Sequence, residues 1–314
     1  MQDKLVDLEN RRDLAYALQS ESQEQVLKLI LNAVERTGNK NVVVSGGYGL
    51  NCVANYYYLD TLKDMDINLY VEPVSSDAGT AIGAAFIAYH QTSQNKEVLP
   101  FGESLYLGLP RNYTSEQVTA TAEKYNATLE TTDVESVVKL MCDKNIVAMF
   151  QGRSESGPRA LGNRSLMYDP TDPNGKDHVN KVKRREYFRP FAGTILAEHA
   201  EEWFDMRGMK ESPHMMYAMN CQPGIGEKIP SIIHVDGTCR IQTVTREQNP
   251  LYYDYINEFY KQTGVPIIFN TSFNLGGEPL VETLDDAFRT LANSDIEYLY
   301  IAEHGILAKV ENVS

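Results

Sequence analysis

The sequence predicts an α/β protein. Segments with helical apolar spacing alternate with short β-branched runs along the 314 residues, and glycine and proline clusters separate them. An apolar content of 42% is enough to build a sizeable core. A chain of this length forms one large domain or two ordinary ones.

The first part of the chain reads as helix, strand, turn, helix, strand, helix. Apolar residues recur at helical spacing over 14–35, and Gly38 follows as a stop. A β-branched run at 42–44 predicts a strand, and the alternation over 67–71 predicts a half-buried one. The segment 79–90 predicts a helix of small residues that packs closely on its neighbours.

A change of composition marks a domain boundary. Residues 93–112 mix polar residues with glycine and proline, and no apolar periodicity runs through them. We therefore divide the chain into a first domain over 1–98 and a second over 99–314.

The second domain repeats the α/β pattern. Thr114 and Gln117 have capping-box spacing at the start of a helix. A buried strand is followed by a long loop rich in glycine and arginine over 151–189. Apolar patterns predict helices at 115–125, 134–142, 251–263 and 283–293, and strands at 146–150, 192–196, 239–244, 265–270 and 297–302.

Composition excludes several classes of protein. The net charge of −14 argues against binding to nucleic acid or to an anionic membrane surface, since both favour a basic face. The four cysteines form no CxxC pair, which argues against a cysteine zinc site and fits reduced thiols. The charged N-terminus is no signal peptide, and no apolar run reaches the length of a membrane span. The composition predicts a cytoplasmic protein.

One candidate site follows the first strand. Gly46 and Gly47 end that strand and Asn51 opens a helix, a pattern in which backbone N–H groups approach a phosphate or ribose. A tight turn is the commoner reading of such a glycine pair. Asp77, just before the small-residue helix, is either a helix cap or a metal ligand, and one carboxylate does not make a metal site.

The loop over 151–189 is basic although the whole chain is acidic. It contains nine bases and five acids, a local net charge of +4. Arginine alternates there with glycine, serine and asparagine, so guanidinium groups and backbone donors share one loop. The pattern is compatible with a small-anion site and equally with a solvated basic ridge.

Two further segments fit an anion site. Arg240 follows an Asp-Gly turn at the start of a strand, and the apolar strand over 265–270 ends in a series of small polar side chains. Ligand sites of α/β proteins lie at such strand ends. The alternative is a polar turn with ordinary capping. The polar side chains are Asn270, Thr271, Ser272 and Asn274.

Taken together, these segments resemble the O-carbamoyltransferases of the NodU/CmcH family. The resemblance extends in order from about Leu14 to Ile301. It is carried by GGYGLNCVAN, SSDAGTAIGAA, QGRSESGPRALGNRS, VKRREYFRPFA, HVDGTCRIQTV and GVPIIFNTSFNLGGEPLVET. The family's usual GGVALN reads GGYGLN here, with Tyr48 and Gly49 in place of valine and alanine.

The resemblance implies a fold and a reaction. It implies part of a sugar-kinase-like, actin/Hsp70-type (ASKHA) domain, which binds ATP and iron or another divalent metal, followed by a YrdC-like domain, which binds carbamoyl phosphate. Carbamoyl phosphate yields carbamate, which attacks the α-phosphate of ATP to give carbamoyl adenylate and pyrophosphate. The hydroxyl of a small-molecule acceptor then attacks the carbamoyl carbon.

The resemblance also implies site residues. Gly46, Gly47 and Asn51 would contact the nucleotide, and Asp77 would bind the metal. Carbamoyl phosphate would be held by Arg159, Lys183, Arg189, Arg240, Asn270 and Ser272, of which Lys183, Arg240, Asn270 and Ser272 would act in catalysis.

The family's N-terminal half, with the HxxxH pair that completes its metal site, does not occur in this sequence. We therefore expect either a fragment or a separate polypeptide that supplies that half. Two alternatives stay open beside the transferase. One is a non-catalytic or partner-dependent subunit that binds carbamoyl phosphate or nucleotide. The other is a YrdC-like relative that acts in tRNA modification, which the acidic balance disfavours.

Overall fold

A computed structural model describes residues 8–94 and 104–310. We call these the N-terminal region and the C-terminal region. The N-terminal region holds a small parallel sheet of two strands, β1 and β2, in register from Asn41–Asn68 to Val44–Val71. Its elements are α1 (Leu8–Thr37), β1 (Asn41–Val44), the 3₁₀ helix η2 (Gly47–Leu50), α2 (Cys52–Lys63), β2 (Asn68–Val71) and α3 (Asp77–Thr92).

Local signals set the boundaries of these elements, and the predicted helices and strands are confirmed. Gly38 ends α1 with a positive φ of 68°, and its N–H donates to the Val34 carbonyl at 2.8 Å. Asn51 is the N-cap of α2, and its side chain accepts from the Ala54 N–H. The apolar faces of α1 and α2 pack together through Leu27, Ile30, Ala54, Tyr58 and Leu62.

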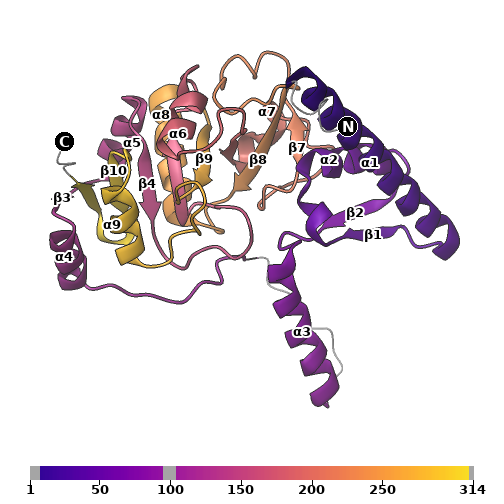
Figure 1. Cartoon of the computed structure of the whole chain (residues 1–314), viewed down its shortest axis with the longest axis horizontal. Helices are drawn as coiled ribbons and strands as arrows, with labels where there is room; N and C mark the ends of the chain where they lie inside the picture. Colours follow the sequence, from indigo (N-terminus) through magenta and orange to yellow (C-terminus); the bar gives the residue numbers. More distant parts are fainter. Residues whose placement is uncertain (1–7, 95–103, 311–314) are drawn as a thin grey trace.

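Helix α3 corrects one expectation. The helix itself is confirmed, but the expected close packing on neighbours is wrong for the described residues. None of its side chains is buried, and it extends away from the rest of the molecule (Figure 1). Small side chains permit close packing, yet they do not determine which surface lies against them.

The C-terminal region is built around a nine-stranded mixed sheet in the order β3-β11-β10-β4-β5-β9-β6-β8-β7 (Figure 1). The pairs β10–β4 and β6–β8 are parallel, and the other pairs are antiparallel. The strands are β3 (Ala127–Thr131), β4 (Val147–Phe150), β5 (Arg164–Tyr168), β6 (Ala192–Leu196), β7 (Ala218–Asn220), β8 (Thr238–Val244), β9 (Ile267–Ser272), β10 (Tyr298–Ile301) and β11 (Ile306–Val310).

Helices cover both faces of this sheet. Alternate residues of one strand face opposite layers, so Ile268 packs with α5 and α8, whereas Ile267 and Phe269 pack with α4, α6 and α9. The helices are α4 (Ser115–Lys124), α5 (Val134–Cys142), α6 (Gly175–Val182), α7 (Ala200–Trp203), α8 (Pro250–Thr263) and α9 (Leu284–Ala292), with short 3₁₀ turns η3 (Ala197–His199) and η4 (Ala302–His304). The α/β class is confirmed.

Most of the predicted elements of this region are confirmed, including the capping box of Thr114 and Gln117 at the start of α4. The description of 151–189 as one long loop is wrong, because β5 and α6 lie within it. Every residue of β5 is buried, including Arg164 at its start. A charged residue at this position interrupts the apolar pattern from which a buried strand is predicted. The sequence analysis also missed β3, β7, β11 and α7.

The two regions contact each other directly. Helix α2 lies against β7, and the buried Asn55 amide donates to the Gly49 carbonyl at 2.8 Å and to the Met216 carbonyl at 2.9 Å. The Tyr56 hydroxyl donates to the Asp205 carbonyl at 3.0 Å. The predicted boundary over 93–112 lies partly outside the described residues, and the division at residue 98 stays a prediction.

Among residues 8–94 and 104–310, no helix combines the length and the apolar character that crossing a membrane requires.

Candidate functional site

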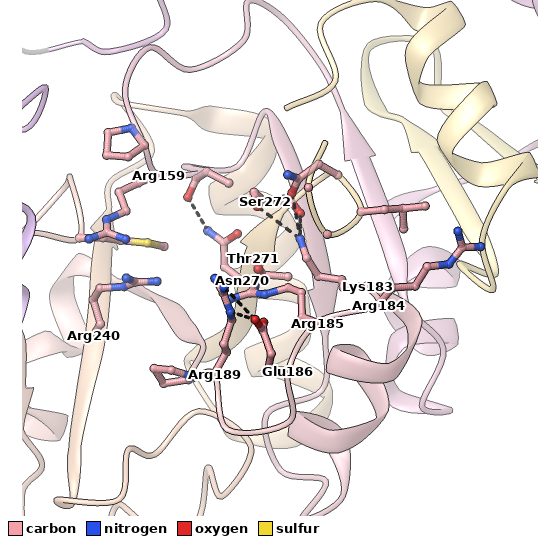
Figure 2. A pocket seen from close by; sticks show the side chains of 18 residues that line it. Arg159, Lys183, Arg184, Arg185, Glu186, Arg189, Arg240, Asn270, Thr271 and Ser272 are labelled. Atoms are coloured by element: carbon pink, nitrogen blue, oxygen red, sulfur yellow. Dashed lines mark hydrogen bonds and ion pairs between the residues drawn. The ribbon is translucent and has the colours of Figure 1, made fainter. Parts of the chain in front are cut away.

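A polar cavity of about 780 Å³ lies where α6, β8 and β9 converge with the loop before β5 (Figure 2). The side chains that line it carry a strong excess of positive charge. Glu186 is the single acid of the lining, whereas six bases surround the space: Arg159, Lys183, Arg184, Arg185, Arg189 and Arg240.

All six residues that the resemblance assigned to carbamoyl phosphate line this cavity. Arg240 comes from β8, Asn270 and Ser272 come from β9, and the other three come from loops or from the end of α6. Residues far apart in the sequence are thus brought together, while their individual roles stay predictions.

Two guanidinium groups face each other across one side of the cavity. Figure 2 shows Arg159 and Arg240 side by side, and within residues 8–94 and 104–310 the buried Nε atom of each has no hydrogen-bond partner. Burial and the neighbouring Arg240 charge lower the pKa of Arg159 to about 10. Like charges held together out of water are stabilised by a bound anion.

Lys183 lies on the other side of the cavity, at the C-terminal end of α6, and is buried. Its ammonium donates to the Ser272 carbonyl, to the Ser272 hydroxyl at 3.3 Å and to the Asn274 side-chain oxygen at 3.1 Å. Burial, and then the charge of Arg185, hold the Lys183 pKa well below its ordinary value. The three donors of this ammonium are directed at the turn after β9, so direct contact with an anion requires one of them to be exchanged.

Arg189 is paired with Glu186, an acid of the same cavity lining. Its Nε donates to Glu186 Oε2 at 2.6 Å, and this hydrogen bond lowers the pKa of Glu186. Burial and the charges of Arg189 and Arg240 lower the pKa of Arg185 beside it. The Arg189 charge is therefore paired with a carboxylate, whereas Arg185 lies close to further positive charges.

Asn270 contributes an uncharged polar side chain to the cavity lining. Its amide N–H₂ donates to the Thr194 hydroxyl at 2.9 Å and to the Ala160 carbonyl at 3.2 Å. Its Oδ1 atom is buried and has no hydrogen-bond partner among the described residues. A buried acceptor without a partner costs free energy, so this oxygen is suited to an N–H donor on a ligand.

The resemblance did not assign Arg185 or Asn274 to carbamoyl phosphate, although Arg185 lies in the basic segment 151–189 and Asn274 among the polar side chains after the strand. Asn274 Oδ1 accepts from Lys183 and also from the Ser272 hydroxyl at 2.6 Å. The turn after β9 lies against the end of α6. The approach is so close that a Cβ on Gly276 would meet the Arg184 carbonyl oxygen at 2.7 Å. Arg185 lies two residues after Lys183, and Asn274 lies two residues after Ser272. This closeness to assigned residues is the signal that indicates them in the sequence.

The bases of 151–189 do not all lie on a solvated ridge. Arg164 is fully buried and donates to the carbonyls of Gln151 at 2.5 Å and of Asn163 at 3.0 Å, so it is structural. Arg153 donates to the Gly108 carbonyl at 2.6 Å. Arg184 points away from the cavity centre (Figure 2) and donates to the Asn293 carbonyl at 2.7 Å.

The predicted nucleotide residues lie outside this cavity. Gly46 lines a separate cavity of about 410 Å³ between the end of β1 and α3, and a Cβ on Gly46 or Gly47 would meet nothing within 4 Å. The Asn51 side chain caps α2 and donates to Gln19 at 2.9 Å. The glycines are therefore open to a ligand, while the Asn51 side chain already has structural partners.

Asp77 does not form a metal site with its surroundings. It is the first residue of α3, and Ser76 rather than Asp77 is the N-cap. Within the described ranges, no three His, Cys, Asp or Glu side chains gather as metal ligands. The iron that the resemblance implies therefore finds no fitting ligand set in these residues.

Comparison with known proteins gives two family matches in chain order. Residues 3–86 match the carbamoyltransferase N-terminus, and residues 138–308 match the carbamoyltransferase C-terminus. Nodulation protein NolO of Bradyrhizobium diazoefficiens is 35% identical over 93% of this chain and 54% of its own length. Nodulation protein NolNO of Sinorhizobium fredii is 35% identical over 94% of this chain and 44% of its own length. The chain spans about half the length of these curated relatives.

Solved structures give a more distant likeness. Full-length HypF in its phosphate- and nucleotide-bound form aligns with 57% of this chain and 25% of its own, at 19% identity and a TM-score of 0.39. HypF of T. kodakarensis aligns with 59% of this chain and 23% of its own, at 17% identity and a TM-score of 0.38. The kinase-like and YrdC-like assignments of the two regions stay predictions.

Proposed function

Since the chain belongs to the carbamoyltransferase family, we propose that its basic cavity binds carbamoyl phosphate for transfer of the carbamoyl group to a hydroxyl. One observation carries the proposal. Among the described residues, six bases and a single acid line one cavity, and the guanidinium groups of Arg159 and Arg240 lie side by side (Figure 2). Such a cluster favours a compact dianion, which replaces its hydration with charge-assisted hydrogen bonds.

The cavity also suits the carbamoyl end of the ligand. A carbamoyl group carries N–H donors, which inorganic phosphate lacks. Asn270 lines the same cavity as Arg159 and Arg240, and its buried Oδ1 is an acceptor that no described residue satisfies. In this proposal the guanidinium groups bind the phosphate oxygens and Asn270 accepts a carbamoyl N–H, so the two ends of the ligand are recognised differently.

The activation step belongs to the same proposal. Water cleaves carbamoyl phosphate to carbamate and inorganic phosphate, and the carbamate attacks the α-phosphate of ATP, which gives carbamoyl adenylate and pyrophosphate. An acceptor hydroxyl then attacks the carbamoyl carbon, and AMP and the hydroxyl proton leave. Gly46 and Gly47 are suited to contact the nucleotide because the space in front of them is open. The described residues do not fit a metal, so we derive no step through one.

A second candidate function is a subunit that binds carbamoyl phosphate but needs a partner polypeptide for chemistry. It is favoured by helix α3, which has no buried side chain among the described residues. Release of pyrophosphate from ATP and carbamoyl phosphate by the isolated chain would identify the complete transferase. Release only after a partner is added would identify the subunit.

Arg240 provides the direct test of the cavity. Charge-assisted hydrogen bonds contribute about 1.5–3 kcal/mol each, so Arg240→Ala should weaken carbamoyl phosphate binding by about tenfold or more. Arg240→Lys should restore only part of the affinity, because an ammonium lacks the planar fork of a guanidinium. Calorimetric titration measures both variants, and circular dichroism verifies their folding.

Arg246→Ala is the matched control. Its guanidinium is about half exposed and pairs with Asp254 at 2.5 Å, away from the cavity lining. This variant should bind like the wild type. If folded Arg240→Ala also binds like the wild type, the cavity does not hold the ligand.

A further inference from the structure

A single buried carboxylate closes the loop that carries Arg159. Glu155 is 7% exposed, and its Oε1 atom accepts three backbone hydrogen bonds. The donors are the N–H groups of Leu161 at 2.7 Å, Asn163 at 2.8 Å and Arg164 at 3.2 Å. The start and the end of the loop are thus joined at one oxygen atom.

The tip of this loop forms part of the cavity wall. Pro158, Arg159 and Ala160 line the cavity, whereas Glu155 does not. Gly157 and Gly162 turn the chain on either side of the tip with φ of 103° and 112°, values that glycine adopts without strain. The position of the tip therefore depends on how firmly the base of the loop is held.

Glu155 holds the base through Oε1, since its Oε2 atom is buried without a hydrogen-bond partner among the described residues. The buried Arg164 places a positive charge near Glu155, while its guanidinium donates to backbone carbonyls. A carboxylate that accepts several backbone N–H groups forms stronger hydrogen bonds than a neutral acceptor does. The hydrogen bonds that Oε1 accepts therefore lie within the loop and not with a ligand.

A firm base matters because Arg159 is held against a like charge. Burial and the charge of Arg240 both disfavour the charged form of its guanidinium, and its Nη2 donates a hydrogen bond to the Leu50 carbonyl at 3.0 Å. A loop free to move would let the two guanidinium groups separate.

We propose that Glu155 is a positioning residue for anion binding, which fixes the 155–164 loop and thereby holds Arg159 beside Arg240. This inference rests on the proposed function and adds a residue that lies outside the cavity. It distinguishes Glu155 from a general base, since the carboxylate touches backbone N–H groups and not the cavity.

A double-mutant cycle in the full chain tests the inference. Carbamoyl phosphate is titrated into the wild type, Glu155→Gln, Arg159→Ala and the double variant. Glu155→Gln preserves the shape of the side chain and removes its charge, whereas Glu155→Ala carries a greater risk of unfolding. We expect each single variant to lose roughly tenfold in affinity. The double variant should bind within about twofold of Arg159→Ala alone, because Glu155 acts through Arg159.

Glu297→Gln is the control for a general loss of stability. Its carboxylate also accepts a backbone hydrogen bond, from the Ile146 N–H at 2.9 Å, but it is absent from the cavity lining. This variant should lower the unfolding temperature and leave the affinity unchanged. If affinity follows stability in both carboxylate variants, Glu155 has only a structural role.

The outcomes separate the two proposals. A wild type that binds neither carbamoyl phosphate nor inorganic phosphate overturns the proposed function and this inference with it. If the wild type binds and folded Glu155→Gln binds equally well, the inference alone is overturned. The same holds if the losses from Glu155→Gln and Arg159→Ala multiply in the double variant.

Discussion

The two regions of the molecule use similar strands in opposite ways. Strand β9 in the C-terminal region is buried on both faces, from Ile267 to Thr271, between two layers of helices. Strand β1 in the N-terminal region pairs only with β2, and Val43 on it remains 67% exposed. Both strands are short β-branched or apolar runs in the sequence, so burial is decided by what lies beside them.

The difference teaches where stability and ligand binding reside. Parallel strands are normally covered on both faces, and the β1–β2 pair has one face covered by α1 and α2. We expect the nine-stranded sheet to provide most of the stability and the rigid frame of the cavity. We expect the N-terminal region to tolerate substitution on its exposed face.

Truncation of one side chain in each sheet should give the largest contrast. Phe269→Ala removes a fully buried ring from the nine-stranded sheet and should cost about 3–5 kcal/mol of unfolding free energy. Val43→Ala in β1 should cost less than about 0.5 kcal/mol because its side chain is mostly exposed. Urea unfolding of both variants measures the costs. Equal costs would mean that Val43 is covered in solution and would end the comparison.

Glycine replacement sharpens the comparison at two turns. Gly162 and Gly46 both have positive φ, but a Cβ on Gly162 would meet the Tyr252 ring at 2.2 Å, whereas one on Gly46 would meet nothing within 4 Å. Gly162→Ala should cost about 3 kcal/mol or more through strain and overpacking, and Gly46→Ala about 1 kcal/mol through strain alone. Thermal unfolding gives the order. A more damaging Gly46→Ala would reveal packing around that turn.

Proton uptake should give the smallest effect, and it compares a lysine from each region. Burial lowers the pKa of Lys183 below its ordinary 10.5, so a bound dianion should raise that pKa and draw in a proton. Affinity should then fall as pH rises through the folded-state pKa, by at most about tenfold per pH unit. Calorimetric titration in buffers of different ionisation enthalpy counts the protons.

Lys183→Met should abolish this uptake, while Lys40→Met, at an exposed lysine near β1, should leave it unchanged. The sign for folding is the opposite of that for binding. The unfolded chain holds the Lys183 proton more tightly, so the contribution of Lys183 to stability improves as pH rises from the folded-state pKa toward 10.5. An uptake that persists in Lys183→Met would assign the proton to another group.

Elements set by local chemistry were predictable from the sequence. The capping box at Thr114, the stop at Gly38 and the apolar periodicity of α5 each act within a few residues, and each prediction is confirmed. Strand β5 was not predicted because its first residue is a buried arginine, whose donors are satisfied by carbonyls distant in sequence. Tertiary hydrogen bonds of this kind leave no local signature.

The candidate site was predictable in composition and unpredictable in arrangement. The sequence indicated Arg159, Arg240 and Asn270 as members of one anion site, and they do line one cavity. It did not indicate that the Lys183 ammonium would be directed at the turn after β9, since that contact depends on how α6 meets the sheet. Nor did it indicate that α3 would have no buried side chain.

The hydrogen bond from Arg159 to the Leu50 carbonyl makes one guanidinium common to both regions. Its donors can satisfy a backbone oxygen at the end of η2 and an anion in the cavity, and the two demands bear on the same side chain. Thermodynamic linkage is reciprocal. If a conformational change in η2 alters the anion affinity by some factor, anion binding alters the conformational equilibrium of η2 by the same factor. Anion binding in the cavity and the conformation of η2 are thus coupled through the Arg159 side chain.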